Sequence, residues 1–248
     1  MNPIVLITGG ARGIGAATAL LAAQRGYAVA VNYSANEEAA NAVVRQIRAG
    51  GGQAIAVQAD VALESQVLAM FEEIDSRLGR LTALVNNAGV VDMAQRVDAM
   101  SVARLRRMFD INVLGSFLCA REAVKRLSTR HGGAGGAIVN VSSAAARLGG
   151  AGQYVDYAAS KGAIDTFTLG LAKEVAAEGI RVNAVRPGII ETEIHASGGQ
   201  PDRANQLAPL VPMQRAGSAL EVAQAIVWLL SDESSYSTGA LLDVAGGR

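Results

Sequence analysis

The segment that decides the fold is "VLITGGARGIGAATALL" at residues 5–21. It begins with a short β-branched apolar run typical of a buried strand, and it ends with the residue spacing of a helix. Between the two, Gly9, Gly13 and Gly15 permit a tight turn and let backbone N–H groups approach a ligand closely. The first turn of the following helix offers unpaired N–H donors and a partial positive charge. The segment therefore predicts a site for the diphosphate of a dinucleotide.

The glycines of this loop follow the spacing G-x-x-x-G-x-G, which differs from the G-x-G-x-x-G of many dinucleotide sites. The loop also lacks the Lys-Ser/Thr pair that ends a P-loop. Taken alone, it keeps an alternative interpretation, a glycine turn that only connects a strand to a helix.

Short β-branched apolar runs alternate with helical patterns along the whole chain. Strands that are apolar throughout indicate a sheet covered on both faces, and regular alternation predicts parallel strands with right-handed crossovers. The predicted strands are 3–8, 28–33, 54–59, 83–88, 137–142, 181–186 and 240–245, and the predicted helices are 13–25, 37–49, 63–78, 101–128, 157–177 and 219–231. Residues 1–248 are thus expected to form one α/β domain, in which the long irregular segment 187–212 is a substrate lid.

The composition argues against several classes of protein. Half of the 248 residues are hydrophobic, 18% are charged and the formal net charge is zero, which predicts a large core without a nucleic-acid or membrane partner. The single cysteine, Cys119, permits no disulfide within the chain, as expected in a reducing cytoplasm. No apolar run reaches the roughly 18 residues of a membrane helix, and no signal peptide is evident. We expect a cytoplasmic protein.

The end of the second predicted strand bears on the choice of cofactor. An acid usually stands there to hold a ribose 2′-hydroxyl, but this chain has Asn32, Tyr33 and Ser34, and Arg12 lies within the glycine loop. A cation without an opposing carboxylate suits a 2′-phosphate, so NADP(H) is favoured over NAD(H). A solvated loop arginine is the alternative interpretation of Arg12.

The next two strands also end in residues suited to a nucleotide. Asp60 follows the third strand, where its carboxylate can accept a hydrogen bond from an adenine amino group. The tetrapeptide "NNAG" at 86–89 ends the fourth strand; its asparagines can cross-link neighbouring strands, and Ala88 and Gly89 leave room for the cofactor. An ordinary turn at a strand end is the alternative for this tetrapeptide.

The stretch "YVDYAASKG" at 154–162 places two tyrosines before one lysine. Because glycines precede it, we expect the helix to begin near Asp156 or Tyr157, with Asp156 as its N-cap. Tyr157 and Lys161 then lie one turn apart on one helix face. The ammonium group is expected to lower the pKa of the phenol from about 10, which suits a general acid. A tyrosine packed on a lysine stem is the structural alternative, and Tyr154 is expected to be a pocket wall or a packing residue.

Six motifs run nearly from one end of the chain to the other. They are "TGGARGIG" (8–15), "NNAG" (86–89), "FDINVLG" (109–115), "VSS" (141–143), "YAASK" (157–161) and "RPGIIET" (186–192). In order and approximate spacing they resemble the classical short-chain dehydrogenase/reductase (SDR) family, in particular a bacterial branch near glucose 1-dehydrogenase and 3-oxoacyl-[acyl-carrier-protein] reductase.

The resemblance implies a Rossmann fold with a seven-stranded parallel sheet, in strand order 3-2-1-4-5-6-7, and helices on both faces. It also implies a homotetramer and a hydride transfer between the cofactor and a carbonyl or alcohol. The implied catalytic residues are Asn112, Ser143, Tyr157 and Lys161, with Ser143, Tyr154 and Tyr157 contacting substrate. The predicted cofactor-binding residues are Gly9, Arg12, Gly13, Ile14, Gly15, Asn32, Tyr33, Ser34, Asp60, Val61, Asn87, Ala88, Gly89, Tyr157, Lys161, Pro187, Gly188, Ile189 and Thr192.

One spacing departs from the family pattern. The family's serine commonly stands about 13 positions before its tyrosine, whereas Ser143 precedes Tyr157 by 14 positions and Ser142 by 15. An insertion in "ARLGGAGQYVD" accounts for the difference if Ser143 is the catalytic residue, and Ser142 is the alternative. In the mechanism that the family implies, the serine holds the carbonyl oxygen, the tyrosine supplies the proton and Asn112 holds a water.

One weaker motif and one rival function leave this interpretation unchanged. In "ETEIH" (191–195), two carboxylates stand near His195, but no second histidine is close, so no metal site is expected. The rival function is a silent NADP-binding sensor on the same fold, although such proteins typically lose the tyrosine or the lysine, and this chain has both. The mostly apolar residues expected around Tyr154 suggest a small, neutral carbonyl or alcohol substrate.

Overall fold

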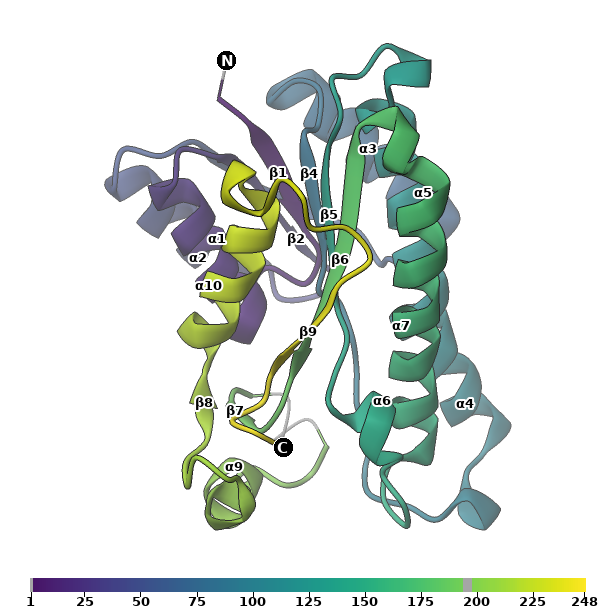
Figure 1. Ribbon diagram of the computed structural model, residues 1–248. Coiled ribbons are helices and arrows are strands. Elements are labelled where there is room, and N and C mark those ends of the chain that lie inside the picture. Colours follow the sequence, from purple (N-terminus) through teal and green to yellow (C-terminus); the bar gives the residue numbers. More distant parts are fainter. Residues whose placement is uncertain (1, 194–197) are drawn as a thin grey trace.

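The computed structural model describes residues 2–193 and 198–248 (Figure 1). Its centre is a seven-stranded sheet in the order β3-β2-β1-β4-β5-β6-β9, and every neighbouring pair in it is parallel. The strands are β1 (Ile4–Ile7), β2 (Ala28–Tyr33), β3 (Ala54–Gln58), β4 (Ala83–Asn86), β5 (Gly136–Val141), β6 (Ile180–Pro187) and β9 (Leu241–Val244). The predicted strand order is confirmed, with β9 as the seventh strand of the predicted series.

Helices cover both faces of this sheet (Figure 1). On one face lie α1 (Gly13–Gln24), α2 (Glu37–Ala49) and α10 (Ala219–Leu230); on the other lie α3 (Glu64–Arg77), α4 (Val102–Phe109), α5 (Gly115–Leu127) and α7 (Val155–Val175). The shorter helices are α6 (Ala145–Leu148), α9 (Arg203–Leu207) and the 3-10 turns Val97–Ala99, Thr129–His131, Ala176–Glu178, Ala208–Leu210 and Asp232–Ser234.

The two halves of the core follow from the alternation of side chains along each strand. In β1, Ile4 and Leu6 pack on the face covered by α3, α5 and α7, whereas Val5 and Ile7 pack on the face covered by α1, α2 and α10. All four side chains are nearly or fully buried. A strand that is apolar at every position is therefore explained by two covered faces.

The sheet order reverses at β1, which pairs with β2 on one side and with β4 on the other. In open parallel sheets, the crevice at the carboxyl ends of strands beside such a reversal is where ligands bind. The glycine loop after β1, "NNAG" after β4 and the serines after β5 all lie at this edge. The topology thus brings together motifs that are far apart in the sequence.

The predicted helix at 101–128 is wrong in one respect, because it is interrupted between α4 and α5. A π-helical turn occupies Asp110–Leu114, and Asn112 within it is buried. Directly after it, Gly115 packs closely against Val61, where an added Cβ would lie 2.7 Å from Cγ2. The interruption turns the Asn112 side chain toward the carboxyl edge of the sheet, as insertions of this kind often do at functional sites.

The segment 187–212, predicted as an irregular lid, contains regular structure. A two-residue strand, β7 (Ile190–Glu191), pairs in parallel with β8 (Gly217–Ser218), and α9 follows in the chain. Residues 194–197 lie outside the described part of the chain, and His195 of the "ETEIH" motif is among them. Within the described residues, no helix combines the length and apolarity needed to cross a membrane.

Candidate active site

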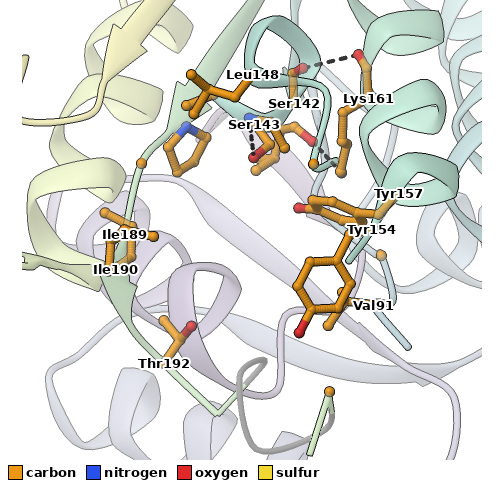
Figure 2. A pocket seen from close by; sticks show the side chains of 18 of the residues that line it. Val91, Ser142, Ser143, Leu148, Tyr154, Tyr157, Lys161, Ile189, Ile190 and Thr192 are labelled. Carbon is orange, nitrogen blue, oxygen red and sulfur yellow. Dashed lines mark hydrogen bonds between the residues drawn. The ribbon is translucent and has the colours of Figure 1, made fainter. Parts of the chain in front are cut away.

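Two adjoining cavities open at the carboxyl edge of the sheet, each of about 380 Å³. The first, the tyrosine cavity, is lined by Ser143, Tyr154, Tyr157 and Lys161 among others (Figure 2). The second, the glycine-loop cavity, is lined by residues of the loop after β1 and by the ends of β2, β3 and β4. Both are lined by Ile14, Asn87, Gly89 and Thr192, so they form one continuous cleft.

The structure distributes the predicted cofactor residues over this cleft. Tyr157, Lys161, Pro187, Gly188 and Ile189 line the tyrosine cavity. The remaining predicted residues other than Gly15 line the glycine-loop cavity, and they are Gly9, Arg12, Gly13, Ile14, Asn32, Tyr33, Ser34, Asp60, Val61, Asn87, Ala88, Gly89 and Thr192. An elongated ligand lying in both cavities would therefore contact both ends of the predicted set.

The glycine loop is held open by the neighbouring strands. Gly9 and Gly13 have φ angles of 60° and 52°, in the left-handed region that glycine adopts without a steric penalty. The Gly9 N–H donates to Oδ1 of Asn32 (3.1 Å), and Nδ2 of Asn87 donates to the carbonyls of Thr8 (2.8 Å) and Gly9 (3.0 Å). These bonds hold the loop in a shape that leaves the first turn of α1 facing the cavity.

Gly15 has a different place from the other glycines of the motif. It is buried and lines neither cavity, and an added Cβ would lie only 2.4 Å from the carbonyl oxygen of Gly9. The structure thus shows a packing role for Gly15, which allows α1 to lie closely under the loop. The third glycine of the dinucleotide fingerprint serves close helix packing in the same way.

Asn32, near the end of β2, and Arg12, in the glycine loop, differ in burial and in their hydrogen bonds. The Asn32 side chain is buried, and it donates to the carbonyl of Ala59 (3.0 Å) while it accepts from Gly9, so it supports the loop. Arg12 and Ser34 are exposed at the rim of the glycine-loop cavity. Oδ1 of Asp60 accepts from the Ala62 N–H (3.0 Å), which shapes the turn after β3.

Tyr157 and Lys161 lie one turn apart on α7, as their spacing predicts. The Lys161 ammonium is 5.7 Å from the centre of the Tyr157 ring, and it donates to the carbonyl of Val141 at the end of β5 (2.7 Å). Figure 2 shows Tyr157, Lys161 and Ser143 on one side of the cavity, with Ile189, Ile190 and Thr192 opposite. The Tyr157 phenol and the Lys161 ammonium group therefore lie on the same wall of the tyrosine cavity.

The pKa values at this wall differ from the sequence-based expectation. Burial raises the pKa of Tyr157 above 10, and a hydrogen bond with Ser143 opposes that rise. Burial also lowers the pKa of Lys161 to about 8, against the negative charge of Asp165, which raises it. The pKa of Tyr157 is therefore raised, not lowered as its spacing from Lys161 predicted, because burial outweighs the hydrogen bond with Ser143. Tyr157 is held as a neutral phenol, the form that donates a proton.

The two serines after β5 are distinguished by their hydrogen bonds. Ser142 is buried, and its hydroxyl donates to the backbone carbonyl of Lys161 (3.1 Å). Ser143 is half-buried, and its hydroxyl accepts from the Ala145 N–H (3.1 Å) and bonds with Tyr157. The geometry favours Ser143 as the residue beside a carbonyl oxygen, while Ser142 supports the lysine's turn of α7.

Asn112 lies behind the cavity wall and lines neither cavity. Its Oδ1 accepts from the N–H of Val90 (2.8 Å), and its Nδ2 donates to the carbonyl of Val90 (3.0 Å) and the hydroxyl of Ser160 (3.1 Å). An added Cβ on Gly89 would lie 3.4 Å from that Oδ1 and 3.5 Å from Nζ of Lys161. The amide is therefore occupied in holding the backbone at Val90 close to Lys161.

The first turn of α7 corrects another prediction. The helix begins at Val155, and its N-cap, Tyr154, makes no capping hydrogen bond through its side chain. Asp156 is not the N-cap; it is buried and accepts two hydrogen bonds from the guanidinium of Arg104, at 2.7 and 3.1 Å. Its partner lies in α4, more than fifty positions earlier, which local capping rules cannot anticipate.

Two charged residues of the tyrosine cavity were not predicted as site residues. They are Arg203, in α9, and Arg248, which follows β9. Arg248 had a usable signal, because residues after the last parallel strand lie at the ligand-binding edge of the sheet. Among the described residues, no group of three or more His, Cys, Asp or Glu is placed to bind a metal.

Comparisons with known proteins agree with this site. A family model described as Enoyl-(Acyl carrier protein) reductase matches residues 9–248. The chain is 60% identical over 245 residues to the uncharacterized oxidoreductase YgfF of Escherichia coli (strain K12), covering 99% of each protein. It is 36% identical over 249 residues to 3-oxoacyl-[acyl-carrier-protein] reductase FabG of Staphylococcus aureus (strain Mu50 / ATCC 700699), covering 100% of this chain and 98% of the relative. The chain therefore belongs to the short-chain dehydrogenase/reductase family and is an oxidoreductase.

Proposed function

We propose that this protein transfers a hydride between NADP(H) and a small carbonyl or alcohol substrate, with Tyr157 as the general acid and base. One observation carries the proposal: Tyr157, Ser143 and Lys161 line a cavity that continues into the cavity of the glycine loop. The relatives named as reductases support the reductive direction.

The residues of the cleft fit a nicotinamide dinucleotide. The positive φ angles of Gly9 and Gly13 shape a loop next to the N-terminus of α1, where a diphosphate finds backbone N–H donors. Gly89 lines both cavities beside Lys161, and without a side chain its backbone can approach a ligand closely. Ile189 and Thr192 lie across the cavity from Tyr157, where they are placed to contact the nicotinamide carboxamide (Figure 2).

A dinucleotide held by these residues would supply the hydride that forms the new C–H bond at the carbonyl carbon. Ser143 donates a hydrogen bond to the carbonyl oxygen, on which negative charge develops. Tyr157 donates its proton to that oxygen, which completes the alcohol, and the Lys161 ammonium stabilises the phenolate that remains. Asn112 contributes by fixing the backbone of Val90 beside Lys161.

Arg12 and Ser34 support NADP(H) over NAD(H). Both are exposed at the rim of the glycine-loop cavity, and no carboxylate stands at the end of β2 among residues 32–36. A guanidinium binds phosphate through two parallel, charge-assisted hydrogen bonds, which a 2′-hydroxyl cannot reproduce.

The proposal is tested by following NADPH and NADH oxidation with a panel of ketones, aldehydes and 3-oxoacyl thioesters. Turnover with NADPH that exceeds turnover with NADH is the expected result. Tight NADPH binding without turnover of any carbonyl would instead favour the sensor function.

We also propose that the protein is a homotetramer. Exposed apolar side chains gather on the helices that cover one face of the sheet, including Phe109, Leu114 and Phe117, and Phe117 stacks on Phe167 at 3.8 Å. Exposed large apolar side chains on one side of a molecule are typical of interfaces between subunits. Sedimentation velocity is expected to show a species of four times the 25.5 kDa chain mass, and a monomer would contradict the proposal.

A further inference from the structure

The charged side chains around the tyrosine cavity are all cationic. Among the described residues that line it, the ionisable groups that carry charge at neutral pH are Lys161, Arg203 and Arg248, and none is Asp or Glu. Lys161 is already engaged with the carbonyl of Val141 and with the catalytic wall. The two arginines have no part in the proposed hydride and proton transfers, so their presence needs another explanation.

Within the described residues, the groups that hold Arg203 in place are neutral. Its Nη2 donates to Oε1 of Gln153 (2.9 Å), its Nη1 donates to Oε1 of Gln200 (2.6 Å), and its guanidinium lies 5.0 Å from the centre of the Tyr154 ring. These two hydrogen bonds occupy two of the five N–H donors of a guanidinium. The contacts given for Arg203 in the described part of the chain thus hold it in place without a carboxylate.

Arg248 carries a donor that is hidden from solvent. Its Nη1 is buried and has no hydrogen-bond partner within the described residues. Arg248 also borders a neighbouring cavity that contains Asp243 and Glu221, but those carboxylates are paired elsewhere. Asp243 pairs with Arg147 (3.0 Å) and Arg186 (3.8 Å), and Glu221 pairs with Arg215 (2.5 Å). A buried guanidinium nitrogen without a partner is unfavourable, so the Arg248 side chain keeps a hydrogen-bonding capacity that the described residues do not satisfy.

We propose that the carbonyl substrate carries an anionic group, a carboxylate or a phosphate, which Arg203 and Arg248 bind while Ser143 and Tyr157 hold the carbonyl. This inference rests on the proposed function and replaces the neutral substrate expected from the apolar residues of the sequence. The apolar side chains Val91, Leu148 and Ile190 then contact the carbon chain between the two polar ends. A cavity of about 380 Å³ restricts that chain to a small molecule or the end of a longer one.

The test compares pairs of carbonyl substrates, each an anion and an uncharged counterpart. Levulinate is compared with methyl levulinate, 2-oxobutanoate with its methyl ester, and dihydroxyacetone phosphate with dihydroxyacetone, each with NADPH. The wild-type protein is expected to show a higher kcat/KM for at least one anion than for its neutral partner. The pair that shows it distinguishes a carboxylate from a phosphate as the group that is bound.

Variants assign the preference to the two arginines. In Arg203→Gln and Arg248→Gln, the ratio of kcat/KM for the anion over its neutral partner is expected to fall about 10- to 100-fold, mainly through KM, as for a lost charge-assisted hydrogen bond. Arg203→Lys keeps the charge and is expected to recover part of the ratio. Lys173→Gln removes an exposed cation from α7, outside the cavity, and is expected to leave the ratio unchanged.

The possible failures are separable. Efficient turnover of neutral ketones with no preference for an anion, or an unchanged ratio in both arginine variants, would overturn this inference and leave the proposed function standing. If no carbonyl is reduced, the proposed function fails, and calorimetric titration of levulinate and methyl levulinate into the protein with NADP⁺ still tests the anion site. Equal affinities for the two probes would then reject it.

Discussion

Arg104 in α4 donates two hydrogen bonds to Asp156, the residue directly before Tyr157 in α7, and both side chains are almost fully buried. The same guanidinium donates to the carbonyl of Met93 (2.6 Å). One arginine thus connects the start of the catalytic helix with the segment that follows β4. The ion pair holds in place the turn that carries Tyr157.

Breaking this pair is expected to destabilise the protein strongly. Arg104→Met leaves the Asp156 carboxylate buried without a countercharge, and removal of one partner of a buried pair costs about 3–5 kcal/mol. Chemical denaturation followed by circular dichroism measures the change in the free energy of unfolding. The double variant Arg104→Met/Asp156→Leu removes both charges and is expected to recover much of the loss. A single variant as stable as the wild type would show that the pair does not hold this turn.

Alanine in place of Gly15, in the glycine loop, and in place of Gly170, in α7, is expected to have opposite effects on the protein. Gly15→Ala puts a methyl group 2.4 Å from the Gly9 carbonyl, so the loop must shift and NADPH affinity is expected to fall at least tenfold. Gly170→Ala lies in α7 with no heavy atom within 4 Å of the added Cβ, so it is expected to stabilise the protein by about 0.5–1 kcal/mol through helix propensity. Fluorescence titration with NADPH and thermal denaturation measure both effects. Undiminished NADPH binding by Gly15→Ala would contradict the packing assigned to Gly15.

Replacement of Arg12 tests the choice of cofactor. Arg12→Ala is expected to raise the Kd for NADPH about 10- to 100-fold, the effect of losing a charge-assisted phosphate contact, with little change in the Kd for NADH. Isothermal titration calorimetry with each dinucleotide measures this. Equal losses for the two cofactors would place Arg12 at the diphosphate or in a structural role.

The pH dependence of carbonyl reduction follows from Lys161. Because burial lowers its pKa to about 8, its ammonium is present below about pH 8 and is lost as the pH rises through that value, while Tyr157, with a raised pKa, stays protonated. We expect kcat/KM for reduction to decline above about pH 8. The negative charge of Asp165 raises the Lys161 pKa, so Asp165→Asn is expected to move this decline to lower pH. A decline that does not move would remove Asp165 from the account.

The sheet was predictable because its signals are local. Each strand is a short apolar run, as in β2 at Ala28–Tyr33, and one glycine loop specifies where the ligand edge lies. The helix pattern at 101–128 hid the π-helical turn, and it also hid the hydrogen bonds between Asn112, in that turn, and Val90, because periodicity does not reveal such contacts.

The site was only partly predictable for a related reason. Tyr157 and Lys161 are four positions apart, so helix geometry alone places them together. The partners of Asp156 and of Tyr154, which are Arg104 and Arg203, come from distant segments that only the fold brings close. The pKa of Tyr157 depends on burial and on a hydrogen bond with Ser143, and burial at a cavity wall cannot be read from residue spacing.

The most direct test of the proposed chemistry is a single-turnover measurement on Tyr157→Phe with bound NADPH and the best carbonyl substrate. The variant removes one hydroxyl and keeps the ring, so NADPH affinity and thermal stability are expected to match the wild type. The rate of NADPH oxidation is expected to fall by at least about 100-fold, the usual contribution of a positioned proton donor. A rate close to that of the wild type, with NADPH bound, would contradict the role assigned to Tyr157.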